Sequence, residues 1–95
     1  MMTTKEMKEV LYQKIKDEGC SFKKSDIKIN KAKNGYKVQV EDFMPIKLIL
    51  TKDDYFGYMV MAEDEFEDIY FGNSKIDYPL HEAMVYIGYY VGTRY

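Results

Sequence analysis

The chain has 95 residues, of which 46% are hydrophobic, and its 14 basic and 16 acidic residues leave a net charge of −2. A chain of this length fits one domain, residues 1–95, with one modest core. A net charge so close to zero does not indicate a particular class of partner. The single cysteine, Cys20, excludes an internal disulfide, and no apolar run reaches the ~18 residues that a membrane helix needs, so we expect a cytoplasmic protein.

The first predicted element is a helix over about residues 5–18. Thr3 followed by Glu6 matches the capping box, in which each side chain satisfies a free backbone N–H at the helix start. Gly19 can adopt the left-handed conformation that closes a helix. The apolar stripe of this helix comprises Met7, Val10, Leu11 and Ile15.

The Asn34-Gly35 pair predicts a β-hairpin, because a two-residue type I′ turn needs positive φ at both of its positions. If the loop holds only these two residues, Ile29 pairs with Val40. The apolar residues of both strands then share one face, namely Ile27, Ile29, Tyr36, Val38 and Val40.

Three further strands are predicted after Pro45, which ends the hairpin because proline cannot donate to a ladder. They cover about residues 46–51, 55–62 and 67–71. The second of them is apolar on both faces, so we expect neighbours on both of its sides.

The last stretch, residues 78–95, is predicted as a helix that Asp77 or Tyr78 can cap, with a strand over residues 85–92 as the alternative. Gly88 and Gly92 each disfavour a helix by roughly 1 kcal/mol relative to Ala, but they also permit another backbone to approach closely. As a helix, the stretch has an apolar stripe formed by Leu80, Ala83, Met84, Ile87 and Val91. Together the elements predict an α+β fold in the order α-β-β-β-β-β-α, an antiparallel meander sheet of four to five strands with an N-terminal and a C-terminal helix.

Residue types that support catalysis are few in this sequence. His81 is the one histidine, and neither a nucleophile nor a metal partner for it can be read from spacing. Cys20 has no adjacent histidine, and the acidic run does not match a calcium loop. We therefore expect no enzyme, no metal and no cofactor.

The acids of the second half are concentrated between residues 53 and 68, beside several aromatic rings. Acids can pair with lysine or arginine of a partner while rings cover the stems of those side chains. Tyr86 and Tyr89 lie on the outward side of the last helix, so either a neighbouring element of the domain covers them or they contact another chain. The predicted partner-binding residues are Asp53, Asp54, Tyr55, Glu63, Asp64, Glu65, Glu67, Asp68, Tyr70, Tyr86 and Tyr89.

These features predict a small non-enzymatic protein-binding domain, an acidic inhibitor or regulator of a basic, nucleic-acid-handling partner. Direct nucleic-acid binding is disfavoured, because no aromatic residue except Tyr36 interleaves with the lysines near the hairpin and the net charge is negative. Two alternatives stay open. One is a pocket between sheet and C-terminal helix, lined by Tyr58, Met59, Met61 and Met84, which would hold a small apolar ligand or support weak enzymatic activity with His81. The other is a homo-oligomer, in which the chain binds itself.

Overall fold

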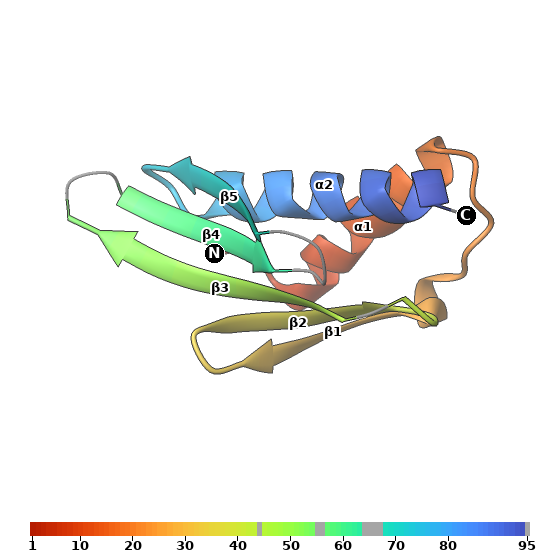
Figure 1. Ribbon diagram of the computed structural model, residues 1–95, viewed down its shortest axis with the longest axis horizontal. Coiled ribbons are helices and arrows are strands. Elements are labelled where there is room, and N and C mark those ends of the chain that lie inside the picture. The colour runs from red at the N-terminus through yellow and green to blue at the C-terminus, as the bar shows by residue number, and fades with distance from the viewer. Residues whose placement is uncertain (44, 55–56, 64–67, 95) are drawn as a thin grey trace.

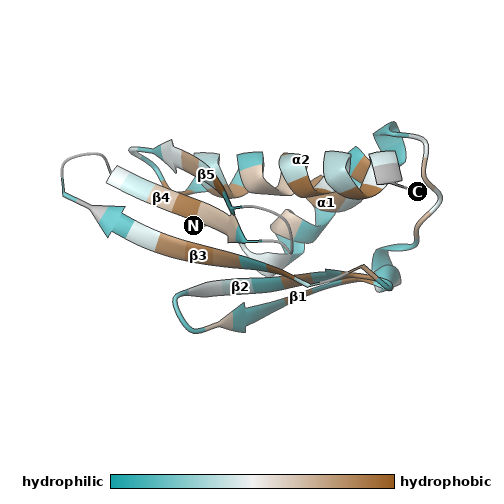
Figure 2. Ribbon diagram, viewed as in Figure 1, coloured by the Kyte–Doolittle hydropathy of each residue, from teal (hydrophilic) through white to brown (hydrophobic). Residues whose placement is uncertain are grey.

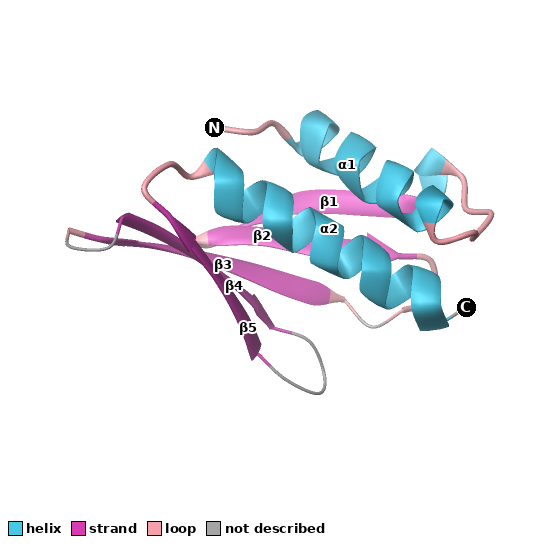
Figure 3. Ribbon diagram, turned by 90° about the horizontal axis from the view of Figure 1, so that it is seen from above, coloured by secondary structure: helices cyan, strands magenta, loops and turns pink. Residues whose placement is uncertain are grey.

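The chain folds into a five-stranded antiparallel meander sheet with both helices on one of its faces (Figure 1, Figure 3). The computed structural model describes residues 1–43, 45–54, 57–63 and 68–94. The strand order is β1-β2-β3-β4-β5, and the predicted α+β meander is confirmed. The elements are α1 (Thr4–Asp17), the short 3₁₀ helix η1 (Lys24–Asp26), β1 (Ile27–Ala32), β2 (Gly35–Val40), β3 (Ile46–Asp53), β4 (Gly57–Glu63), β5 (Asp68–Asn73) and α2 (Asp77–Arg94).

Helix α1 begins and ends as the sequence predicts. The backbone N–H of Glu6 donates to Thr3 Oγ1 at 3.1 Å, and the N–H of Thr3 donates back to Glu6 Oε1 at 3.1 Å. After the last turn, Gly19 has φ +91°, a left-handed value that costs glycine little. Met7, Leu11 and Ile15 point into the core, so the capped ends place one apolar stripe against the sheet.

The register of the β1–β2 hairpin differs from the prediction. Ile29 pairs with Val38 rather than Val40, and the turn comprises residues 33 and 34. Asn34 takes the positive φ, at +61°, whereas Gly35 lies in β2, where a side chain would collide with the backbone of β3. Glycine is therefore needed at this position because β3 packs closely against it, and not because of the turn. A shift of two residues keeps every side chain on its face, so the predicted apolar face is confirmed.

All of the buried strand residues lie on the face that the helices cover. Core side chains from the strands are Ile27, Tyr36, Val38, Val40, Ile46, Leu48, Val60 and Ala62, and they pack against Met7, Leu11 and Ile15 of α1 and Leu80, Ala83, Met84, Ile87 and Val91 of α2. The predicted helix for the closing stretch and its apolar stripe are thus confirmed. Figure 2 shows mostly hydrophilic colouring around the turn of the β1–β2 hairpin and more apolar colouring along β3 and β4.

Helix α2 starts at Asp77, so this residue is inside the helix rather than its cap. Its first backbone bond of the i to i−4 type runs from the N–H of Leu80 to the carbonyl of Ile76, at 3.3 Å. The carboxylate of Asp77 instead accepts a hydrogen bond from the N–H of Met2 at 2.6 Å. That bond joins the N-terminal end of the chain to the start of α2. No helix within the described ranges combines the length and apolarity that crossing a bilayer requires.

The two glycines of α2 lie where α1 crosses it. A Cβ added at Gly88 would lie 2.6 Å from Lys14 Cβ, and one added at Gly92 would lie 2.5 Å from Glu18 Cβ. Both distances are shorter than van der Waals contact between carbons. The glycine spacing thus allows the backbones of the two helices to approach within the domain.

Candidate protein-interaction surface

The face of the sheet opposite the two helices presents apolar side chains across three strands. Ile49 on β3 pairs with Met61 on β4, and Met61 pairs with Tyr70 on β5. Met59 lies one row further along β4 on the same face. None of the four is buried, and Tyr70 is 60% exposed. We call this surface the open sheet face.

A row of charged residues borders the apolar row on the open sheet face. Lysines occupy β2 and β3, and acids occupy β4 and β5. The pairing places these residues directly opposite one another, in the order Lys37, Lys47, Glu63, Asp68. Neighbouring strands are about 4.8 Å apart, so the sign of the charge changes once, in the middle of the row.

A second surface lies on the side of α2 that points away from the sheet. Tyr89 is 54% exposed there, and the Lys14 ammonium of α1 sits 5.9 Å from the centre of its ring. A hollow of about 430 Å³ is lined by Lys14, Phe71, His81, Glu82, Val85, Tyr86 and Tyr89. We call this surface the outer face of α2.

The ammonium of Lys14 is paired with the carboxylate of Glu18, the residue directly after α1. Its ammonium lies 2.9 Å from Glu18 Oε1, and this hydrogen bond is the largest reason why the pKa of Lys14 is raised above its ordinary value. The raised pKa extends the cationic form of the lysine to higher pH, and this form is the one that interacts favourably with the Tyr89 ring.

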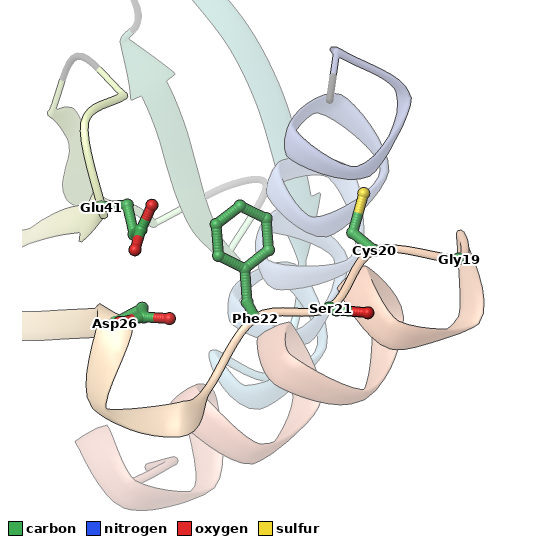
Figure 4. Close-up of a pocket in the computed structure, with 6 residues that line it drawn as sticks. All are labelled: Gly19, Cys20, Ser21, Phe22, Asp26 and Glu41. Carbon is green, nitrogen blue, oxygen red and sulfur yellow. The ribbon is translucent and has the colours of Figure 1, made fainter.

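Another hollow, of about 350 Å³, lies at the end of α1 and is lined by Gly19, Cys20, Ser21, Phe22, Asp26 and Glu41 (Figure 4). The Cys20 thiol points to α2 and donates to the carbonyl of Gly92 at 3.2 Å, while the ring of Phe22 lies between it and the two carboxylates. His81 is eleven positions before Gly92 on the same helix, about 16 Å along its axis. The cysteine and the histidine therefore do not form a catalytic pair.

No known protein family, curated protein or solved structure matches this chain. Function is thus to be inferred from the arrangement of its own side chains. Among the described residues, no three histidine, cysteine or acidic side chains gather as a metal site would require.

The predicted acidic residues fall at the two ends of the β3–β4 pair. Glu63 and Asp68 are paired neighbours on β4 and β5. Asp54 follows the other end of β3, and seven residues of strand at about 3.3 Å each put it roughly 20 Å from Glu63. Asp53 ends β3, and its side chain is outside the description, as are the predicted residues Tyr55, Asp64, Glu65 and Glu67 as a whole.

The predicted tyrosines divide between two sides of the molecule. Tyr70 lies on the open sheet face, whereas Tyr89 points outward from α2, on the opposite side of the sheet. Tyr86 is half-buried, with its ring centre 5.9 Å from that of Phe71 and 6.4 Å from that of Tyr90. These rings close the space between α2 and β5, so Tyr86 contributes to packing within the domain.

Ile49, Met59 and Met61 of the open sheet face are not among the predicted partner-binding residues, whereas Tyr70 is. Their signal in the sequence is an interruption of alternation, since Ile49 stands where Lys47 and Thr51 lead one to expect a polar residue. Met59 and Met61 show the same excess in β4. In β4 this signal predicts a strand inside the sheet, which is confirmed, and a pocket lining that includes Met59 and Met61, but it does not by itself indicate a contact surface.

The predicted ligand pocket is not assembled from its expected residues. Met84 is fully buried in the core, whereas Met59 and Met61 are on the open sheet face. The hollow next to His81 belongs to the outer face of α2 and has a different lining.

Proposed function

We propose that this chain is a small non-enzymatic domain that works by binding another protein through the open sheet face. The observation that carries the proposal is the row of Ile49, Met61 and Tyr70, which lies across three strands and over which none of the described helices packs. Apolar side chains that gather on an exposed face usually mark a contact surface.

The shape of this face favours a protein over a small ligand. A small ligand is held in a concave site that buries most of its surface. The open sheet face is instead a layer of strands, on which Tyr70 stands 60% exposed. Tyrosine and methionine are both enriched at the centres of protein interfaces.

The charged border indicates the chemistry of the partner. Glu63 and Asp68 are paired neighbours beside the apolar row, and the sequence between them adds Asp64, Glu65 and Glu67. A partner with basic residues next to an apolar patch complements this arrangement. In this proposal the domain is an acidic regulator or inhibitor that occupies a basic site, including one that handles nucleic acid.

An affinity experiment with purified, tagged protein and extract of the source cell tests the proposal. We compare the wild type with Met61→Glu, which places a charge in the apolar row at a half-exposed position. Tyr89→Ser, on the outer face of α2, is the matched control. Circular dichroism and thermal melting verify that both variants fold.

We expect wild type and Tyr89→Ser to retain the same protein, and Met61→Glu to lose it. Retention should weaken when salt is raised from about 0.05 to 0.5 M, because screening acts on the charged border. Equal retention by Met61→Glu would show that the open sheet face is not the contact surface.

A further inference from the structure

We propose that the open sheet face pairs with the same face of a second copy of the chain, across a two-fold axis that runs along the strands between β3 and β4. This inference deepens the proposed function, because it names one partner for the same surface. It rests on the order of charges in the charged row, which has lysines on β2 and β3 and acids on β4 and β5.

A two-fold axis along the strand direction turns one sheet over onto the other and reverses the order of its strands. Strand β2 then lies over β5 of the second copy, and β3 lies over β4 of the second copy. Lys47 faces Glu63 of the second copy, and Lys37 faces Asp68 of the second copy. By symmetry, each of these opposite-charge contacts occurs twice.

The charged row also disfavours the other orientation of the two copies, in which the two-fold axis runs across the strands. If the axis ran across the strands, each residue of the row would face its own equivalent. Lys47 would then face Lys47 of the second copy, and Glu63 would face Glu63. Like charges in contact disfavour a complex, so the row selects one of the two orientations.

The apolar row is also complementary to itself under this operation. It continues from Ile49 to Gly35 on β2, which has no side chain. Ile49 therefore faces Met61 of the second copy, and the exposed ring of Tyr70 faces Gly35. The largest side chain of the row thus meets the position that has no side chain. The two sheets would pack face to face with aligned strands, as in a β-sandwich.

The size of the surface sets the strength of the expected dimer. Four strands at about 4.8 Å and three rows at about 6.6 Å give roughly 400 Å² per copy, or on the order of 800 Å² in total. Interfaces below about 1,200 Å² are those of weak, transient complexes. We therefore expect dissociation constants of roughly 10 to 100 µM, which makes dimerisation depend on protein concentration.

Analytical ultracentrifugation of the full chain at about 10 µM to 1 mM tests this inference. We expect the wild type to shift from monomer to dimer over this range at low salt, and less so at high salt. Lys47→Glu makes two acids face two acids, and Glu63→Lys makes two lysines face two lysines. Each change should weaken the dimer about tenfold or more. Lys5→Glu, an exposed change of the same charge on α1, should leave it unchanged.

Two further samples distinguish charge pairing from a general effect of the substitutions. Mixing Lys47→Glu protein with Glu63→Lys protein places opposite charges at every facing position, so the mixture should form a heterodimer. The double variant Lys47→Glu, Glu63→Lys restores complementarity within one chain and should dimerise like the wild type. A loss of folding would appear in the melting curves and would not be rescued by mixing.

The results separate this inference from the proposed function. A wild type that stays monomeric at 1 mM and low salt would overturn self-pairing, as would a Lys47→Glu variant that dimerises like the wild type. If the affinity experiment still retained another protein through Met61, the proposed function would stand without self-pairing. If Met61→Glu lost no partner while the charge variants behaved as expected, the second copy alone would be the partner.

Discussion

Replacing Gly88 by alanine tests the packing of the two helices, because two effects of opposite sign act at this position. Alanine favours a helix over glycine by about 1 kcal/mol, so propensity alone predicts that the variant is more stable. The added Cβ, however, would lie 2.6 Å from Lys14 Cβ and 3.3 Å from the carbonyl oxygen of Leu11. Carbon atoms in contact need about 3.5–4.0 Å, so the helices must separate by roughly 1 Å.

The separation is costly because the residues next to Gly88 on α2 belong to the core. Ile87 is fully buried, as is Leu11 on the facing side of α1. Overpacking of this kind costs about 1–3 kcal/mol, which exceeds the gain in helix propensity. We expect a net loss of about 1 kcal/mol in the free energy of unfolding, or about 4–8 °C in the melting temperature of a domain of this size.

Thermal melting followed by circular dichroism, with urea unfolding beside it, measures this difference. Gly72→Ala is the matched control, because the nearest atom to its added Cβ is the Tyr58 carbonyl oxygen at 3.7 Å, an ordinary contact. That change should stabilise slightly, by about 0.5 kcal/mol, since it restricts the unfolded chain. A Gly88→Ala variant that melts higher than the wild type would refute the close approach of α1 and α2.

Three further changes test other parts of the fold. Gly35→Ala would collide with a β3 carbonyl and should cost at least about 3 kcal/mol of the free energy of unfolding in urea. Thr3→Ala removes the capping box and should cost about 1 kcal/mol in the same assay, whereas Thr4→Ala, one position later, should cost less. The pKa of Lys14 is raised by Glu18, so the stabilisation from this pair is fully present below the ordinary lysine pKa and is lost as the pH rises through the raised value. The difference in stability between wild type and Lys14→Met should therefore be constant from about pH 7 to 10 and shrink above it; a difference that changed near neutrality would contradict this assignment.

The elements of the fold could be predicted because their signals are local. Thr3 and Glu6 are close in sequence and bond to each other, and Gly19 needs no tertiary contact to take a positive φ. The stripe from Leu80 to Val91 likewise follows from helical spacing alone, and it outweighs the low helix propensity of the two glycines. Packing against α1 is the reason that the glycines are there.

The hairpin register could not be predicted because a distant strand decides it. Asn34 and Gly35 both tolerate a positive φ, so the sequence favours a turn that uses both. The N–H of Leu50 on β3, however, donates to the carbonyl of Asn34 at 2.7 Å, and β3 comes too close to Gly35 for any side chain there. The local sequence of the hairpin contains no information about the contacts that β2 makes with β3.

The candidate surface could be predicted only in part, for a related reason. Tyr70, Glu63 and Asp68 were predicted as single members of an acidic and aromatic run, and the pairing of β4 with β5 brings them together. The same meander moves Asp54 to the far end of the strands. Alternation indicates that Ile49 and Leu50 point to opposite faces, but only the position of the helices decides which face stays uncovered.

The sheet edges and the open sheet face lead to different kinds of assembly. Only pairing through the open sheet face limits the number of copies in the assembly. Pairing of a β1 edge with a β5 edge of another copy would place the Lys28 side of one chain beside the Asp68 side of the next, and it would leave two free edges at every step. Such contacts are heterologous and grow into open filaments. Pairing of open sheet faces uses the same patch on both copies and ends at two. The sign change between Lys47 and Glu63 is what permits the closed arrangement. We therefore expect sedimentation at the highest concentration to reach a dimer and go no further, whereas continued growth beyond two copies would assign the association to the edges.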